Sequence, residues 1–182
     1  MHVMIDLETL STRLPDAAIA SIGAVVFYPT QPAEQIAENP MFSQSVVLAT
    51  NQSRHIDGGT VAWWLSQSEA ARNALLTDAV PLPFALNSLA KWLTEHQPKT
   101  VWANSPSFDC VLLRHAFDQH GVRWPFNYWD ERCLRTIKAL VYPHGDAPRI
   151  RIGAAHGAVA DAVSQAVLVA HCYEALKRPV TS

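Results

Sequence analysis

Two acidic residues, Asp6 and Glu8, end the first apolar run of the chain, MHVMIDLETLS. Side chains alternate between the two faces of a β-strand, so both carboxylates project from the same face. Two like charges on one face repel each other, and the pair is stable only where the face opens to water or where a cation lies between them. Carboxylate oxygens are ligands that Mg²⁺ prefers. The pair therefore indicates either a solvated strand end or part of a metal centre.

A third acidic residue, Asp109, lies in the segment FDCVLLRHAF. Leu112 and Leu113 follow it three and four positions later, so in a helix Asp109 leans toward the apolar side. Burying an unpaired carboxylate costs on the order of several kcal/mol, so a metal, a cationic partner or a raised pKa would be needed. The alternative is a solvated residue at a helix start, where the helix dipole favours a negative charge.

Asp161 lies near the start of the last predicted helix, five residues after His156. Taken alone, an aspartate in a first helical turn is commonly a good N-terminal residue, and a lone histidine is commonly packed or at the surface. The chain has one Asp-x-Glu and one histidine followed five residues later by an aspartate, at opposite ends, with Asp109 between them. The ordered set is more informative than any one of its members.

Apolar patterns indicate the elements that must position these residues. Strands are expected at residues 1–5, 18–27 and 41–48, with a short central strand at 100–104. Thr60 is a plausible N-cap for a helix over 61–67. Further helices are expected at 68–76, 83–96, 105–121, 131–141 and 158–177. The predicted buried stripe of the 83–96 helix consists of Phe84, Leu86, Leu89, Ala90 and Leu93. Strands followed by helices and a short strand predict an α/β sheet with helices packed on it.

Composition limits the class of protein. The 182 residues are 49% hydrophobic and 16% charged, which fits one domain, 1–182, with one well-filled core. The net charge of −2 gives no global basic field, so a nucleic acid would have to be held by a local site and metals. Cys110, Cys133 and Cys172 lack zinc-site or disulfide spacing and predict buried thiols in a reducing compartment. No signal peptide or membrane span is expected, which favours a cytoplasmic protein.

The order of these motifs resembles that of the DEDDh 3′–5′ exonucleases, a ribonuclease H-like family that includes ribonuclease T and oligoribonuclease. DLET at 6–9 is similar to the first family motif, SFD at 107–109 to the second, and HGAVAD at 156–161 to the third. PDAAIASIGAVVF, VAWWLSQSEAAR and VWANSPSFDCVLLRHAF resemble the phage and prophage exonuclease VIII and exoribonuclease-like branch more closely. The resemblance implies a ribonuclease H-like mixed sheet flanked by helices, in the cytosol of a bacterium or of a phage-infected host.

The resemblance also implies roles for the five residues. Phosphodiester hydrolysis needs an activated water, a stabilised leaving group and neutralised phosphoryl oxygens, which two Mg²⁺ ions can supply. Asp6 would contact both ions, Glu8 and Asp161 would hold one, and Asp109 would serve the other. His156 would accept the proton of the attacking water. Mn²⁺ could replace Mg²⁺.

Substrate-binding residues are expected near these motifs. Thr9 and Leu10 follow the first motif, and the resemblance implies that their turn lines the pocket of the 3′-terminal nucleotide; an ordinary strand-to-loop turn is the alternative. Trp64 is expected to stack on a base, which contributes about 1–3 kcal/mol per base. Adjacent tryptophans on a helix point in different directions, so either Trp63 or Trp64 is expected in the core.

Polar residues before the second and third motifs are further candidates. Arg149 and Arg151 precede His156 in a loop rich in proline and glycine, and they either contact a phosphate or are simply solvated. Asn104 and Ser105 precede the second motif and either orient the site or cap a helix.

The function favoured by sequence is a metal-dependent 3′–5′ exonuclease that acts on single-stranded RNA or DNA ends and releases nucleoside 5′-monophosphates. A catalytically silent nucleic-acid-binding module of the same fold is one alternative, although all five family residues are present. A phosphodiesterase acting on small nucleotides is another, because the same metals would support it. A homodimer is expected from the resemblance alone. The choice between RNA and DNA depends on a contact to the 2′-hydroxyl that the sequence does not locate.

Overall fold

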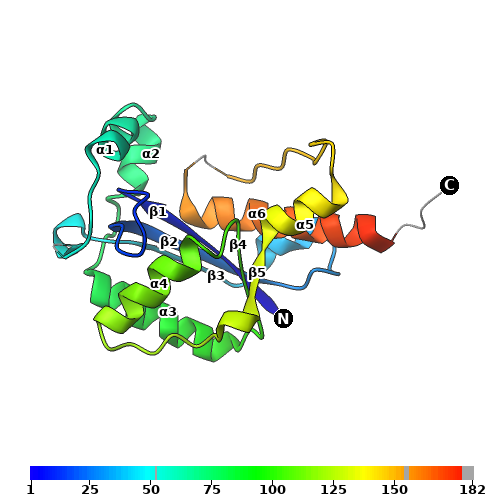
Figure 1. Ribbon diagram of the computed structural model, residues 1–182, viewed down its shortest axis with the longest axis horizontal. Helices are drawn as coiled ribbons and strands as arrows, with labels where there is room; N and C mark the ends of the chain where they lie inside the picture. The colour runs from blue at the N-terminus through cyan, green and yellow to red at the C-terminus, as the bar shows by residue number, and fades with distance from the viewer. Residues whose placement is uncertain (52, 154–155, 178–182) are drawn as a thin grey trace.

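The computed structural model describes residues 1–51, 53–153 and 156–177, so eight residues of the predicted 1–182 domain lie outside the described part. Its centre is a five-stranded sheet in the order β3-β2-β1-β4-β5 (Figure 1). The strands are β1 (His2–Thr9), β2 (Ile19–Phe27), β3 (Met41–Ser45), β4 (Val101–Ala103) and β5 (Glu131–Cys133). β2 pairs antiparallel with β1 and β3, whereas β4 pairs parallel with β1 and β5. The predicted α/β fold with a mixed sheet is confirmed.

Helices cover both faces of this sheet. They are α1 (Gly58–Leu65), α2 (Glu69–Ala74), α3 (Leu82–His96), α4 (Asp109–Gln119), α5 (Leu134–Val141) and α6 (Ala158–Lys177), with short 3₁₀ helices η1 (Ala33–Glu38), η2 (Leu48–Asn51) and η3 (Tyr128–Asp130). Figure 1 shows α3 and α4 together on one side of the strands, and α5 beside α6 on the other side. No described helix has the length and apolar character that a bilayer crossing requires.

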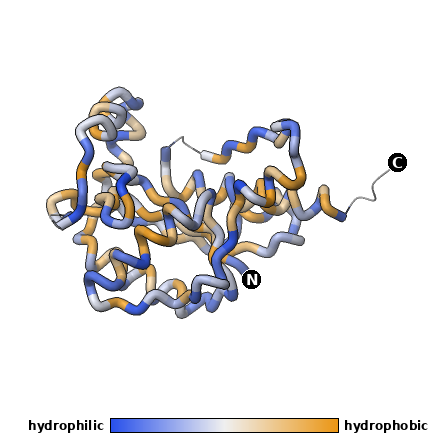
Figure 2. Tube along the Cα trace, in the orientation of Figure 1, coloured by the Kyte–Doolittle hydropathy of each residue, from blue (hydrophilic) through white to orange (hydrophobic). Residues whose placement is uncertain are grey.

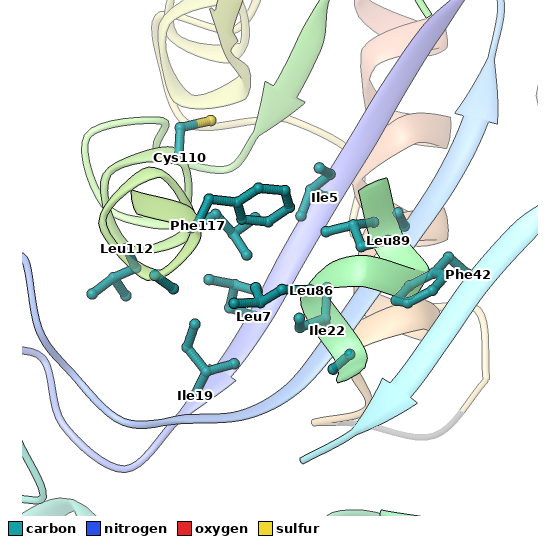
Figure 3. Packing of buried hydrophobic residues seen from close by; sticks show 14 of the residues in the cluster. Ile5, Leu7, Ile19, Ile22, Phe42, Leu86, Leu89, Cys110, Leu112 and Phe117 are labelled. Atoms are coloured by element: carbon teal, nitrogen blue, oxygen red, sulfur yellow. The ribbon is translucent and has the colours of Figure 1, made fainter. Parts of the chain in front are cut away.

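The alternation of β1 divides the core into two parts. Val3, Ile5 and Leu7 pack against residues of α3 and α4 on one face, where Figure 3 shows Ile5 and Leu7 beside Leu86 and Phe117. Met4 packs on the opposite face with residues of β2 and α6. Hydrophobic residues follow the strands of the sheet in Figure 2. Since β1 lies between two other strands and has helices on both faces, its position and orientation are fixed by packing.

Four local expectations were wrong. β1 continues through both carboxylates to Thr9, because its pairing with β2 extends that far. Residues 131–133 form a strand instead of the first turn of a helix, since they pair with β4. The N-cap of α1 is Asp57, whose carboxylate accepts the backbone N–H of Thr60. Phe84 is 59% exposed, because the buried face of α3 is rotated toward Leu82 and Ala85.

Candidate active site

Three carboxylates converge where β1 passes beneath the start of α6. One oxygen each from Asp6, Glu8 and Asp161 lies within 4.8 Å of the other two. β1 provides Asp6 and Glu8 on one face, as the alternation predicted, and the first turn of α6 provides Asp161. The three candidate ligand atoms are all carboxylate oxygens, which are the donors that hard divalent cations such as Mg²⁺ prefer.

A glycine in the neighbouring strand allows this close approach. Gly23 of β2 pairs with Asp6, and a Cβ built on it would lie 2.1–2.3 Å from backbone atoms of Ala158 and Val159. The backbone of α6 therefore rests directly on the backbone of the sheet. Without a side chain at position 23, Asp161 can reach the level of Asp6 and Glu8.

Asp109 approaches the cluster from the other side of β1. It is the first residue of α4, is buried, and lines a cavity of about 510 Å³ together with Asp6. α4 follows β4, which is parallel to β1, so the carboxyl end of β4 brings the helix start to the same edge. The solvated helix-start alternative is wrong for Asp109, because its side chain is enclosed.

The electrostatics of the cluster disfavour four full negative charges. Burial, with the charge of Asp109, raises the pKa of Asp6 well above its usual value, against the hydrogen bond from Gln165. Burial, with the charges of Asp161 and Asp109, raises the pKa of Glu8 to about 7. Burial also raises the pKa of Asp109 to about 7, although backbone hydrogen bonds and the charge of Arg135 oppose the shift. A bound divalent cation would remove both the repulsion and the cost of desolvation. The donor set therefore fits a divalent metal.

Gln165 is a site residue that the sequence analysis missed. It lies one helical turn after Asp161 on α6, and its Nε2 donates a hydrogen bond to Oδ1 of Asp6 at 2.7 Å. Its Oε1 is buried and accepts no hydrogen bond from the described residues. The spacing of four residues from Asp161 was the available signal, because it places both side chains on one helix face.

Arg135 was also missed. It lies in the first turn of α5 and lines the cavity that contains Asp6 and Asp109. Its backbone N–H donates to the carbonyl of Asn104 at 3.3 Å, which fixes the start of α5 beside the end of β4. Arg135 lies within the helix predicted over 131–141, away from any motif, so nothing in the sequence indicated its proximity to Asp109.

His156 lies two residues before the start of α6 and has a left-handed backbone, φ 59°. Its ring meets the ring of Trp63 edge to face, with 4.9 Å between the ring centroids. The ring nitrogens of His156 form no hydrogen bond with the described residues. The structure thus brings His156 to the N-terminal end of the helix that carries Asp161, beside an aromatic pair.

A second cavity, of about 470 Å³, adjoins Glu8. Thr9, Trp63 and Phe108 are among its lining residues. Trp63 is 44% exposed, whereas Trp64 is 5% exposed and donates its indole N–H to the carbonyl of Thr9 at 2.9 Å. Trp64 also lines this cavity, but its ring is almost fully buried, whereas the ring of Trp63 is accessible. Stacking of Trp64 on a base therefore stays a prediction.

The turn after the first motif also differs from its expectation. Leu10 is buried with Ala18 and Trp64, so its side chain belongs to the core. Its backbone N–H donates to Ala18 and its carbonyl accepts from Asp57. The backbone groups of this turn are thus already bonded within the protein, and Thr9 reaches the cavity while Leu10 does not.

The remaining predicted residues lie at three different places. Asn104 and Ser105 line the cavity of Asp6 and Asp109, and the carbonyl of Ser105 also accepts the backbone N–H of Asp109. Arg151 reaches Oδ1 of Asp161 at 3.5 Å. Arg149 is not brought to the carboxylates, because it lines a separate cavity between α5 and the loop that precedes α6.

Comparison with known protein families gives one match over most of the chain. A family model described as the 3'-5' exoribonuclease Rv2179c-like domain matches residues 1–173. No protein with a curated description matches the sequence. The matched range includes all five residues of the three motifs.

Solved structures share the fold at low sequence identity. The nuclease domain of 3'hExo, a DEDDh family member bound to rAMP, has a TM-score of 0.60 and 11% identity, over 95% of this chain and 91% of that one. The metal-free E. coli ExoI–ssDNA complex has a TM-score of 0.60 and 14% identity, and this chain spans 98% of its own length but 40% of ExoI. S. pombe Pop2p with Mg²⁺ and Mn²⁺ bound has a TM-score of 0.55 and 14% identity, over 94% of this chain and 81% of Pop2p. These structures share the ribonuclease H-like exonuclease fold.

Proposed function

The chain belongs to the Rv2179c-like 3'-5' exoribonuclease domain family and is a nuclease hydrolase, and from this premise we propose that it removes nucleotides from the 3′ end of single-stranded nucleic acid by metal-dependent hydrolysis. The observation that carries the proposal is the convergence of Asp6, Glu8 and Asp161 within 4.8 Å, with Asp109 buried beside Asp6. The products would be nucleoside 5′-monophosphates.

This arrangement would hold two divalent cations. Asp6 would contact both, Glu8 and Asp161 would hold the first, and Asp109 would hold the second. Bound there, the cations would supply a hydroxide nucleophile and neutralise charge on the phosphoryl and leaving oxygens. Mg²⁺ is the proposed ion and Mn²⁺ a substitute, and the Pop2p structure bound to both ions supports this choice.

His156 would act as the general base. Its imidazole would accept one proton from the attacking water, while the hydroxide oxygen forms the new P–O bond and the 3′-oxygen of the preceding nucleotide leaves. The edge-to-face contact with Trp63 holds the ring at the start of α6, close in sequence to Asp161. Arg151, paired with Asp161, is suited to a phosphoryl oxygen during this step.

The cavity beside Glu8 would hold the 3′-terminal nucleotide. Its exposed Trp63 ring provides a face for a base, and Thr9 lines the cavity next to the carboxylates. At about 470 Å³ it is within the usual size range of small-molecule sites. A single-stranded substrate is supported by the ExoI–ssDNA complex, and a bound nucleotide by rAMP on 3'hExo.

The direct test is degradation of matched 5′-labelled single-stranded RNA and DNA 12-mers in Mg²⁺, Mn²⁺ or EDTA. We expect a ladder that shortens from the 3′ end, requires a divalent metal and is absent in Asp6→Asn. Asp118→Asn is the matched control, because it makes the same change on the exposed side of α4 and should leave turnover unchanged.

Other outcomes identify the competing functions. Binding of the 12-mers without cleavage under any metal would favour a silent binding module. Cleavage restricted to dinucleotides would favour a phosphodiesterase of small nucleotides. The relative rates on RNA and DNA would show which sugar the site accepts.

A further inference from the structure

Positive charge is concentrated in one part of the chain. Residues 132–151 contain five cationic side chains and one acidic side chain, Arg132, Arg135, Lys138, Arg149, Arg151 and Asp146. The whole protein has 14 Lys and Arg against 16 Asp and Glu, so the remainder carries 9 against 15. A net +4 segment in a protein whose other residues sum to −6 would provide a local site for a polyanion.

Two elements within this segment face each other. α5 leaves the carboxylate cluster, and the chain then turns at Gly145, φ 77°, and returns toward the start of α6 (Figure 1). Ile150 and Ile152 pack against the core beneath α6, and the N–H of Ile152 donates to the hydroxyl of Ser164 at 2.9 Å. The arginines that alternate with these isoleucines are exposed. The returning loop is therefore anchored by its apolar residues and presents its cations outward.

A cavity of about 440 Å³ lies between α5 and this loop. Lys138 and Arg149 line it from opposite sides, with the ring of Tyr142 and several small or apolar residues between them. None of its lining residues is acidic. Neither cation has a carboxylate partner within 4 Å among residues 1–51, 53–153 and 156–177. Two cations without counter-charges in one cavity are suited to an anion.

The cavity is connected to the carboxylate cluster by one face of α5. Arg135 and Lys138 are three residues apart and therefore neighbours on this helix. Arg135 lines the cavity of Asp6 and Asp109, and Lys138 lines the cavity beyond it. The pocket beside Trp63, proposed for the 3′-terminal nucleotide, adjoins Glu8 on the other side of the cluster. A strand whose last nucleotide occupies that pocket would continue past Arg135 toward Lys138.

We propose that the cavity between Lys138 and Arg149 binds a phosphodiester on the 5′ side of the scissile bond, so that α5 and the loop 142–153 guide a single strand of several nucleotides into the cluster. The direction of the bound strand, with its 3′ end at the carboxylate cluster, rests on the proposed function. The recognised group is the phosphodiester anion, with Tyr142 beside it to contact a base or sugar. Both RNA and DNA backbones carry this anion, so the site does not discriminate between ribose and deoxyribose. It favours longer substrates, because only a strand of several nucleotides reaches it.

The test compares long and short substrates with the double variant Lys138→Gln/Arg149→Gln. We expect about tenfold weaker binding of a 5′-fluorescein 10-mer in EDTA, measured by anisotropy. The slope of log affinity against log salt should fall by about 0.7, the value for one phosphate contact with a single strand. In Mg²⁺, kcat/KM for the 10-mer should fall about tenfold while that for a dinucleotide is unchanged. RNA and DNA 10-mers should respond alike.

Lys99→Gln/Arg123→Gln is the matched control, because it removes two exposed charges on the α3 and α4 side of the sheet. Equal effects of the two double variants would overturn the proposal, as would an equal loss on the dinucleotide and the 10-mer. If the wild-type protein cleaves neither nucleic acid but binding still weakens only in Lys138→Gln/Arg149→Gln, the proposed function fails and the binding site stands.

Discussion

The two oxygens of Asp6 lie in different environments. Oδ1 accepts the hydrogen bond from Gln165, and the other oxygen accepts none from the described residues. The hydrogen bond fixes the rotation of the carboxylate, so the unpaired oxygen keeps a constant direction relative to Glu8 and Asp161. A group that orients a ligand in this way acts on metal affinity through geometry, without contacting the metal.

We therefore predict that Gln165→Leu weakens divalent metal binding by about tenfold, because a group that hydrogen-bonds to a metal ligand typically contributes 10–100-fold in metal affinity. Titration calorimetry with Mn²⁺ measures this without reference to turnover. Leucine keeps the approximate volume, so the thermal midpoint in EDTA should change little or increase. A Leu variant that binds Mn²⁺ as tightly as the wild type would show that Asp6 needs no orienting donor.

The contact between β2 and α6 decides whether the carboxylates of Asp6, Glu8 and Asp161 meet. Asp161 is carried by α6, and Asp6 by the strand that pairs with β2. The missing side chain of Gly23 lets the backbones of β2 and α6 touch. The atoms that a Cβ would meet are backbone carbonyl and amide atoms of Ala158 and Val159, which cannot rotate away as a side chain would.

Gly23→Ala should consequently displace the first turn of α6 and abolish measurable nuclease activity. Overpacking of this kind costs about 2–3 kcal/mol of folding stability. A thermal melt and the 12-mer assay measure the two effects. Gly58→Ala is the control, because a Cβ there meets nothing within 4 Å and should leave both quantities unchanged. A Gly23→Ala protein that is as stable and active as wild type would contradict the close contact.

Sequence patterns predicted the long elements better than the short contacts between them. Strand alternation placed Asp6 and Glu8 on one face, and helical periodicity gave α6 its observed bounds, because both patterns are local. β5 was missed, since three residues show no alternation and form a strand only by pairing with β4. Adjacent Trp63 and Trp64 could not be told apart without the direction of the core.

Site residues outside the motifs were the least predictable. Arg149 and Arg151 are two positions apart, yet one lines the α5 cavity and the other pairs with Asp161, as the path of the loop dictates. Gln165 and Arg135 belong to the site only because two elements distant in sequence meet. The assignment to the exonuclease VIII branch and the expected dimer remain predictions, whereas membership of the exoribonuclease domain family agrees with the motif order.

The whole molecule must fold around a cluster of like charges, so its stability depends on pH and metal together. Burial raises the pKa values of Glu8 and Asp109 to about 7, so without metal the folded state holds protons that the unfolded chain releases near pH 4. Between about pH 4 and pH 7 the folded state binds more protons than the unfolded state. The stability of the metal-free protein therefore decreases as pH rises through this range, because deprotonation leaves buried, mutually repelling carboxylates.

His2 opposes this trend, since burial lowers its pKa to about 4 and its contribution to stability rises with pH up to about 6.5. The comparison of wild type with Asp109→Asn isolates the cluster, because His2 is common to both. In EDTA, Asp109→Asn should gain stability over wild type at pH 8 and little at pH 5.5. Urea denaturation at the two pH values measures this difference.

A bound divalent metal should reverse the pH dependence of folding stability. A divalent cation binds the deprotonated carboxylates and not the unfolded chain, so it stabilises the fold by an amount that grows with pH as protons stop competing. We expect Mg²⁺ to raise the urea midpoint of the wild type clearly at pH 8 and scarcely at pH 5.5, and to have little effect on Asp109→Asn/Asp161→Asn at either pH. An equal effect of Mg²⁺ on both proteins would mean that the ion binds elsewhere, and the cluster would then need another partner to balance its charge.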